Sequence, residues 1–194
     1  MISLLMNEME YSFCDINESG ETIIKAAQIL YLTFTGGDEN RWLKNSKDAL
    51  DEVRECVEKP NICTGIKAGN ELAGWAGIRP MYEKTWELHP MVIKRECQGK
   101  GYGRALLGEM EMLARLNGLI GLVAGSDDET FSTSLSGKEI TGENILEEIK
   151  NIKNHKNHPF EFYVKCGFAI VGIIPNANGP QKPDIWLWKD VRSP

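Results

Sequence analysis

Two segments near the start of the chain carry apolar residues at helical spacing. The first spans 20–34, and the second runs from a capping residue, Asn45 or Ser46, to about Glu58. Both have one apolar face and one polar face, which is typical of helices that cover a core. The pattern therefore predicts two amphipathic helices joined by the polar loop 35–45.

Seven other segments have the alternating or β-branched apolar residues of strands. The segments 62–67 and 71–78 flank the turn Ala68-Gly69-Asn70 and predict a hairpin. The other predicted strands are 10–16, 85–93, 119–124, 168–174 and 184–189.

Helical spacing returns at 105–116, between the strands 85–93 and 119–124. A strand–helix–strand order predicts a parallel pair of strands. Two further helices are predicted at 143–155 and 160–165. The sequence shows neither an internal repeat nor a linker composition, so we expect one mixed α/β domain over residues 1–194.

Composition narrows the function classes. The net charge of −6 argues against a general nucleic-acid binder and suits a cationic small-molecule partner. The five cysteines are widely spaced, without a CxxC pair or a Cys/His cluster, so we expect buried, inert thiols in a reducing cytoplasm, without disulfides and without a metal site. The sequence has neither a signal peptide nor an apolar run that could span a membrane, so no membrane association is expected.

The segment 98–104, QGKGYGR, combines three alternating glycines with two basic residues. A Walker loop is excluded, because Lys100 is followed by Gly101 rather than by Ser or Thr. A dinucleotide fingerprint is excluded, because its final glycine position falls on Arg104. The segment is then either an anion-binding turn at a helix start, suited to a pyrophosphate, or a flexible loop.

Two short motifs resemble a known family. The pattern Gln98-x-x-Gly101-x-Gly103 resembles the acetyl-CoA-binding turn of the GNAT N-acetyltransferases. The segment 162–168, FYVKCGF, resembles their second motif, in which an aromatic–Tyr pair precedes Gly-Phe. The two motifs together, at this separation and in this order of strands, identify the chain as a member of that superfamily.

Longer segments resemble the aminoglycoside 6'-N-acetyltransferases. They are WELHPMV at 86–92, HPFEFYVKCGF at 158–168 and VGIIPNANGPQKPDIW at 171–186, with the turn Gly125-Ser126-Asp127-Asp128 between them. The resemblance extends from about residue 74 to the end and is weaker over 1–70.

The resemblance implies a fold and partners. The fold would be α/β (mixed α+β), with a mostly antiparallel sheet of about six to seven strands, a parallel splayed pair in its middle and helices on both faces. The co-substrate would be acetyl-CoA, without a metal. The acceptor would be a small-molecule polycationic amine, and the protein would form a homodimer.

The resemblance also implies roles for individual residues. Glu87 would act as the base or as an anchor for the amine, and Tyr163 would give a proton to the CoA thiolate. Alternatively, Glu87 is a structural ion-pair partner and Tyr163 only packs its helix. The implied cofactor-binding residues are Met91, Val92, Ile93, Gln98, Gly99, Lys100, Gly101, Tyr102, Gly103 and Arg104.

For the acceptor, the resemblance and the need for negative charge point to aromatic and acidic residues. The implied contacts are Phe34, Glu87, His89, Asp127 and Asp184, with Trp42, Asp128 and Glu129 as further candidates. Phe34 stands where relatives often have a Trp, which could alter the sugars that are accepted. Two other functions stay open: acetylation of a polyamine or a protein amine, and CoA sensing without turnover.

Overall fold

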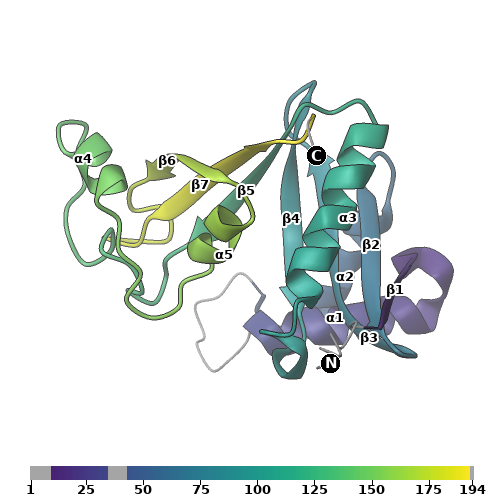
Figure 1. Cartoon of the computed structure of the whole chain (residues 1–194). Helices are drawn as coiled ribbons and strands as arrows, with labels where there is room; N and C mark the ends of the chain where they lie inside the picture. The colour runs from purple at the N-terminus through teal and green to yellow at the C-terminus, as the bar shows by residue number, and fades with distance from the viewer. Residues whose placement is uncertain (1–9, 35–42, 193–194) are drawn as a thin grey trace, which may run out of the picture. The chain divides into compact units, whose positions relative to one another are not determined.

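The computed structural model describes residues 10–34 and 43–192. Its seven strands form one sheet in the order β1-β2-β3-β4-β5-β7-β6, with helices flanking it (Figure 1). The strands are β1 (Tyr11–Cys14), β2 (Ile62–Ala68), β3 (Glu71–Pro80), β4 (Thr85–Ile93), β5 (Gly121–Asp127), β6 (Ala169–Ile174) and β7 (Asp184–Asp190). The helices are α1 (Gly20–Phe34), α2 (Ser46–Val57), α3 (Tyr102–Leu116), α4 (Ile145–Lys150) and α5 (Phe160–Lys165), with 3-10 turns at Ile16–Glu18 and Arg95–Cys97.

The described residues belong to two compact units. The first comprises those within 1–80 and 89–113, and the second those within 81–88 and from 114 onward. The boundary falls inside β4, between Leu88 and His89.

The core of the first unit lies between α1, α2 and strands β1–β4. Figure 1 shows α3 in front of these strands and α1 and α2 behind them. Trp75 of β3 is fully buried in this core, and its indole N–H donates to the Ala26 carbonyl in α1 over 2.9 Å. Val53 of α2 and Val92 of β4 belong to the same apolar cluster. The periodic apolar stripes of the two helices are thus buried against the strands, as their spacing predicts.

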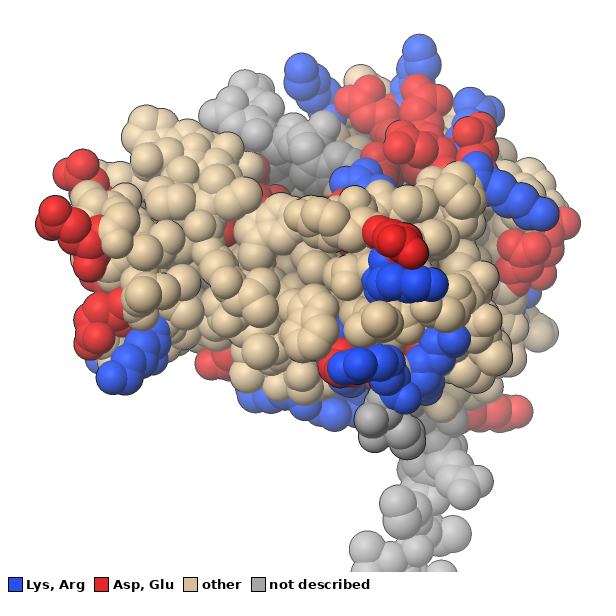
Figure 2. Space-filling model, turned by 90° about the horizontal axis from the view of Figure 1, so that it is seen from above, with Lys and Arg blue, Asp and Glu red and all other residues tan. Residues whose placement is uncertain are grey.

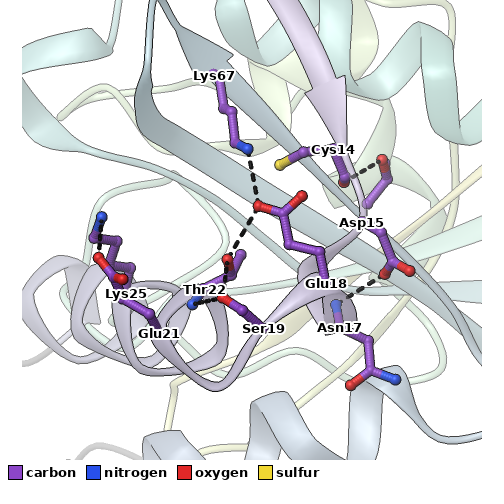
Figure 3. Close-up of polar contacts among 10 residues, drawn as sticks. Cys14, Asp15, Asn17, Glu18, Ser19, Glu21, Thr22, Lys25 and Lys67 are labelled. Carbon is purple, nitrogen blue, oxygen red and sulfur yellow. Dashed lines mark hydrogen bonds and ion pairs between the residues drawn. The ribbon is translucent and has the colours of Figure 1, made fainter.

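Polar contacts at the start of α1 fix where the chain turns from β1 into the helix (Figure 3). The Ser19 hydroxyl accepts from the backbone N–H of Thr22 over 3.1 Å, which caps the helix. The Thr22 hydroxyl and the Lys67 ammonium both donate to Glu18, over 3.1 and 2.9 Å. These hydrogen bonds, from Lys67 first, lower the pKa of Glu18. The cluster ties α1 to strand β2.

Strand β7 organises the second unit. It pairs antiparallel with β5 along its whole length, from Gly121↔Asp190 to Asp127↔Asp184, and with β6 on its other side. The start of β4 pairs with β5 in parallel, from Thr85↔Gly121 to Glu87↔Val123. The sequence-based predictions of a mixed α/β fold and of a parallel pair around the helix at 105–116 are therefore confirmed.

The predicted helix at 143–155 is mostly wrong. Only Ile145–Lys150 is helical. The following residues make backbone hydrogen bonds to another segment instead, because Ser134 N–H donates to Lys153 O over 2.9 Å and His155 N–H to Ser132 O over 2.8 Å. Long-range backbone pairing thus replaces the helical hydrogen bonds that the local apolar spacing favours.

Two element ends also differ from the predictions. The segment 125–128 was expected as a turn after the strand, but Gly125–Asp127 continues β5, because each residue has a partner in β7. The first strand ends at Cys14, and Ile16 begins a 3-10 turn capped by the Asp15 side chain. The short helix Phe160–Lys165 is confirmed, and Gly167 after it has a φ of 91° that favours glycine.

Candidate active site

The glycine-rich segment 98–104 is a turn that leads directly into α3. Gly99 and Gly101 have φ values of 72° and 92°, a conformation that side-chain-bearing residues rarely adopt. The Gly101 carbonyl accepts the N–H of Ala105 over 3.1 Å, which closes the first helical turn. The first N–H groups of a helix have no partner within it and carry a partial positive charge. Lys100 and Arg104 are exposed beside them, so the segment fits an anion such as a pyrophosphate.

The side chains of Gln98 and Val92 have structural roles. The Gln98 amide donates to the Ile93 carbonyl over 3.0 Å and so braces the turn against the end of β4. Val92 is 2% exposed and packs in the core between α1 and α2. Any contact of Val92 with a ligand is therefore left to its main chain, whereas the Gln98 side chain is exposed. Met91 and Ile93, on either side of Val92, are half-buried.

Glu87 occupies the last position of the parallel register between β4 and β5. Its partner there is Val123, and both strands continue beyond this pair. The parallel register between β4 and β5 ends at this pair, so the next backbone groups of β4 lie outside that hydrogen-bonded ladder. Glu87 is half-buried.

Three carboxylates lie on one face of the second unit's sheet. Alternation along β5 puts Val123 and Asp127 on the same side, and Asp184 of β7 is directly opposite Asp127. Glu87 is next to Val123 across β4 and β5. The sheet therefore brings together Glu87, Asp127 and Asp184, three of the residues that the sequence singled out.

This crowding changes the ionisation of Asp184. Burial first, then the negative charges of Asp127 and Glu87, raise the pKa of Asp184 to about 6, although the Ser126 N–H donates to its carboxylate over 2.9 Å. Gly125 makes room for this carboxylate, since a Cβ there would lie 3.3 Å from Asp184 Oδ2. A cationic ligand would relieve the repulsion among these groups.

His89 is held by a residue that sequence reasoning missed. Its Nε2 lies 3.2 Å from Oε1 of Glu52 in α2. Leu88, Pro90 and Val92, which alternate with His89 along β4, are buried, whereas His89 is half-buried. The signal in the sequence was the position of Glu52 beside the inward-facing Val53 and three residues after Ala49, on the edge of the apolar stripe.

Tyr163 is packed among aromatic rings in α5. Its ring lies edge-on to Phe162 and Phe168, with centroids 5.3 and 5.5 Å apart. Burial, with a smaller contribution from Cys166, raises the pKa of Tyr163 to about 12. The phenol therefore keeps its proton throughout the physiological pH range.

Three other candidates for the acceptor site are Asp128, Phe34 and Trp42. Asp128 is completely buried and accepts hydrogen bonds from Ser132, Thr133 and Ser136 over 2.7–2.8 Å, so it anchors its own loop and does not face a ligand. Phe34 packs partly buried against the core between α1 and α2. Trp42 lies outside the described residues.

The surface carries charged side chains of both signs. The face in Figure 2 has Lys and Arg side chains interspersed with Asp and Glu side chains.

Among the described residues, no group of three or more His, Cys, Asp or Glu side chains is arranged to hold a metal ion. No helix within 10–34 and 43–192 is both long and apolar enough to cross a membrane. The five cysteines have free thiols. Only Cys56 is buried, so the expectation of buried thiols is wrong for the other four, which are half-buried.

Comparison with known proteins identifies the family. The chain matches the acetyltransferase (GNAT) family over residues 25–132, which is more than half of its length, so it belongs to the GNAT acetyltransferases. A comparison with curated proteins finds no match.

Solved structures give a more detailed likeness. A crystal structure of an aminoglycoside 6'-N-acetyltransferase in complex with coenzyme A is 31% identical and has a TM-score of 0.84. The aminoglycoside 6'-N-acetyltransferase from Enterococcus faecium is also 31% identical, with a TM-score of 0.82. An aminoglycoside 6'-acetyltransferase type Ii is 29% identical, with a TM-score of 0.68. Each of these alignments covers 96% of this chain and 99% of the other.

Proposed function

We propose that this protein transfers the acetyl group of acetyl-CoA to a primary amine, and that the acceptor is the 6'-amine of an aminoglycoside. The observation that carries the proposal is the full-length likeness to aminoglycoside 6'-N-acetyltransferases, at 31% identity over 96% of this chain. The coenzyme A in one of those structures supports acetyl-CoA as the co-substrate. The co-substrate supplies an activated acetyl thioester.

The turn at 98–104 would bind the pyrophosphate of acetyl-CoA through the N–H groups at the start of α3. Gly99 and Gly101 allow the backbone to curve there, and Lys100 and Arg104 add positive charge. The main chain of Met91 and Val92 would bind the thioester arm, with an N–H directed at the acetyl carbonyl oxygen.

Glu87 would prepare the acceptor amine. An alkyl amine has a pKa of about 10 and is mostly an ammonium ion at neutral pH. A carboxylate near it attracts the ammonium and takes its proton, directly or through water. The neutral nitrogen then attacks the thioester carbon and a C–N bond forms. The nitrogen gives up a second proton to solvent as the C–S bond breaks, so that the products are the amide and the CoA thiolate.

Tyr163 would stabilise that thiolate. Its pKa of about 12 is roughly three units above that of an ordinary thiol, so complete proton transfer from the phenol to sulfur is unfavourable. A hydrogen bond from the phenol to the sulfur needs no such transfer. The role that we propose for Tyr163 is therefore a hydrogen-bond donor, with the proton itself coming finally from solvent.

The acidic face with Glu87, Asp127 and Asp184 would attract the acceptor. Aminoglycosides carry several ammonium groups. Burial, and then the negative charges of Asp127 and Glu87, raise the pKa of Asp184, and an ammonium group beside these carboxylates would favour their ionised forms.

The test measures release of free CoA thiol from acetyl-CoA with an aminoglycoside panel, a polyamine and a cell extract. Aminoglycosides with a free 6'-amine should give rapid release, and their acetylated position is read by mass spectrometry. Acetyl mass on a polyamine or on a protein, with none on the drugs, would contradict the aminoglycoside assignment. Tight acetyl-CoA binding without any release would contradict transfer itself.

The co-substrate site has its own test. Gly101→Val should weaken acetyl-CoA binding, because a side chain at φ 92° strains the turn. Lys100→Gln combined with Arg104→Gln should raise the Kd roughly tenfold or more without backbone strain. Gly142→Val is the control, since Gly142 is an exposed glycine with no atom near its Cβ position. Normal affinity in the folded Lys100/Arg104 variant would place the co-substrate elsewhere.

A further inference from the structure

The acidic face of the second unit also carries an aromatic side chain, Trp186 of β7. Side chains alternate along a strand, so Trp186 points to the same side of the sheet as Asp184. Gly125 of β5 is directly opposite Trp186, two residues before Asp127 on that side. These residues and Glu87 all belong to the second unit, so their arrangement is set within one compact body.

The strands on both sides of Trp186 have a glycine beside it. Gly172 of β6 is its partner on one side, and Gly125 of β5 is its partner on the other. A Cβ at Gly172 would have no described atom within 4 Å, and a Cβ at Gly125 would lie 3.3 Å from the Asp184 carboxylate. Glycine inside a strand often marks a place where a ligand approaches the sheet closely. A flat molecule therefore has room to lie against the indole.

The polar atom of Trp186 is turned away from solvent. The residue is half-buried, but its Nε1 is buried and makes no hydrogen bond to a described residue. Burial raises the pKa of Asp184 and the indole N–H lowers it, so the N–H lies near this carboxylate without being aligned as a hydrogen bond. The side chain thus offers a ligand the carbon atoms and the π face of its ring.

An aromatic ring among carboxylates suits a cationic sugar better than a cationic chain. The face of an indole attracts ammonium groups and packs against flat apolar surfaces, such as the C–H face of a sugar ring. A sugar ring is rigid, whereas a linear polyamine loses rotational freedom when it is fixed on such a surface. The carboxylates attract the ammonium groups of both kinds of molecule.

We propose that Trp186 is a specificity-determining residue of the acceptor site, whose ring stacks on an amino-sugar ring while the carboxylates of the acidic face bind its ammonium groups. The inference rests on the proposed acetyl transfer and deepens it, because it selects cyclic amino sugars over linear polyamines. Charge attracts either acceptor, and the indole distinguishes between them.

The first test observes binding without turnover. Protein with ¹⁵N-labelled tryptophan is titrated with kanamycin or with spermine, with coenzyme A in place of acetyl-CoA so that no transfer occurs. The chain has five tryptophans, so a Trp186→Phe sample identifies the Trp186 indole signal. Kanamycin, which has sugar rings, should shift this signal more, and at lower concentration, than spermine, which carries its ammonium groups on a linear chain. A Trp186 signal that does not move in a large excess of kanamycin, or that moves equally with both, overturns the proposal.

The second test uses steady-state kinetics with kanamycin as acceptor. Trp186→Leu should raise the KM for kanamycin roughly tenfold with kcat nearly unchanged, because a contact made equally in the bound and reacting states is lost. Trp186→Phe keeps an aromatic ring and should recover most of the loss. A KM in Trp186→Leu equal to that of the wild type overturns the proposal. So does a KM in Trp186→Phe as high as in Trp186→Leu, because packing volume would then explain the effect.

Tyr82→Leu is the matched control. It also removes an aromatic ring from the second unit, but Tyr82 is 65% exposed and precedes β4, outside the sheet. Its KM and kcat should equal those of the wild type, and the Kd of acetyl-CoA should be unchanged in all three variants.

Failure of this inference and failure of the proposed function give different results. If Trp186→Leu does not fold, the titration of the wild type and the kinetics of Trp186→Phe still decide the role of the ring. If the wild type acetylates no amine, the proposed transfer fails, while the titration still decides whether an amino sugar binds at Trp186.

Discussion

Asp184→Asn should make the protein more stable and less active at neutral pH. The pKa of Asp184 is raised from its ordinary value of 3.8 to about 6, because the carboxylate is half-buried beside Asp127 and Glu87. A raised carboxyl pKa means that the folded state holds the proton more tightly than the unfolded chain. The ionised carboxylate therefore costs folding free energy, and asparagine removes that cost while it can still accept from Ser126 N–H.

The size of the gain in stability follows from the pKa shift of Asp184. Two pKa units correspond to about 3 kcal/mol of unfolding free energy, and partial exposure makes this an upper value. The cost is absent where both states are protonated, below the ordinary value of 3.8. It grows as the pH rises and is complete above about 6. At pH 4 only about a fifth of it is present.

Thermal and urea unfolding of the wild type and Asp184→Asn at pH 4 and pH 8 measure this difference. The variant should gain about 1–3 kcal/mol at pH 8, or roughly 3–8 °C in Tm, and much less at pH 4. In the same preparation, kcat/KM for a polycationic acceptor should fall roughly tenfold, because one attracting charge is lost. A gain in stability at the cost of activity is expected of a residue kept for binding.

The control is Asp51→Asn, which removes an exposed carboxylate on α2. It should leave both the unfolding free energy and kcat/KM nearly unchanged. A stability gain in Asp184→Asn that is equal at the two pH values, or a loss at pH 8, would refute the electrostatic reasoning. Undiminished kcat/KM would remove Asp184 from the acceptor site.

Two further predictions concern stability alone. Gly77→Ala should lower the unfolding free energy by about 1–3 kcal/mol, because its Cβ would meet Cys56 Sγ. Adding Cys56→Ala to the same chain should restore part of the lost stability, and urea unfolding of the two single variants and the double variant measures this coupling. Burial opposes ionisation of Asp128, yet the hydrogen bonds from Ser132, Thr133 and Ser136 outweigh it and lower the pKa. Asp128→Ala should therefore cost about 3 kcal/mol at pH 7, and this difference should shrink as the pH falls through the lowered pKa; equal costs at pH 7 and in acid would contradict the role of the ionised form.

Local patterns in the sequence were enough to predict most helices and strands. Agreement with the structure is found for the amphipathic helices at 20–34 and 46–57, the hairpin around Gly69 and the short helix at 160–165. These features depend on the spacing of apolar residues and on turn residues, which act over a few positions. The helix predicted at 143–155 failed for the opposite reason: residues 153–155 bond to the backbone at 132–134, some twenty positions earlier. No local pattern shows that bond.

The sequence by itself determined the order of strands and helices along the chain, the glycine turn before α3 and the motifs of the GNAT acetyltransferases. Each of these is contained in a short run of residues and needs no distant partner. Only the tertiary structure decided how the charged residues divide their roles. Asp127 and Asp128 are neighbours in the chain, yet alternation along β5 places Asp127 opposite Asp184, while Asp128 is buried under its own loop. Glu52 and His89 are far apart in sequence and meet only because α2 packs onto the strand at Gly77. Burial and charge at a given atom depend on which elements pack there, and this is set by the fold as a whole.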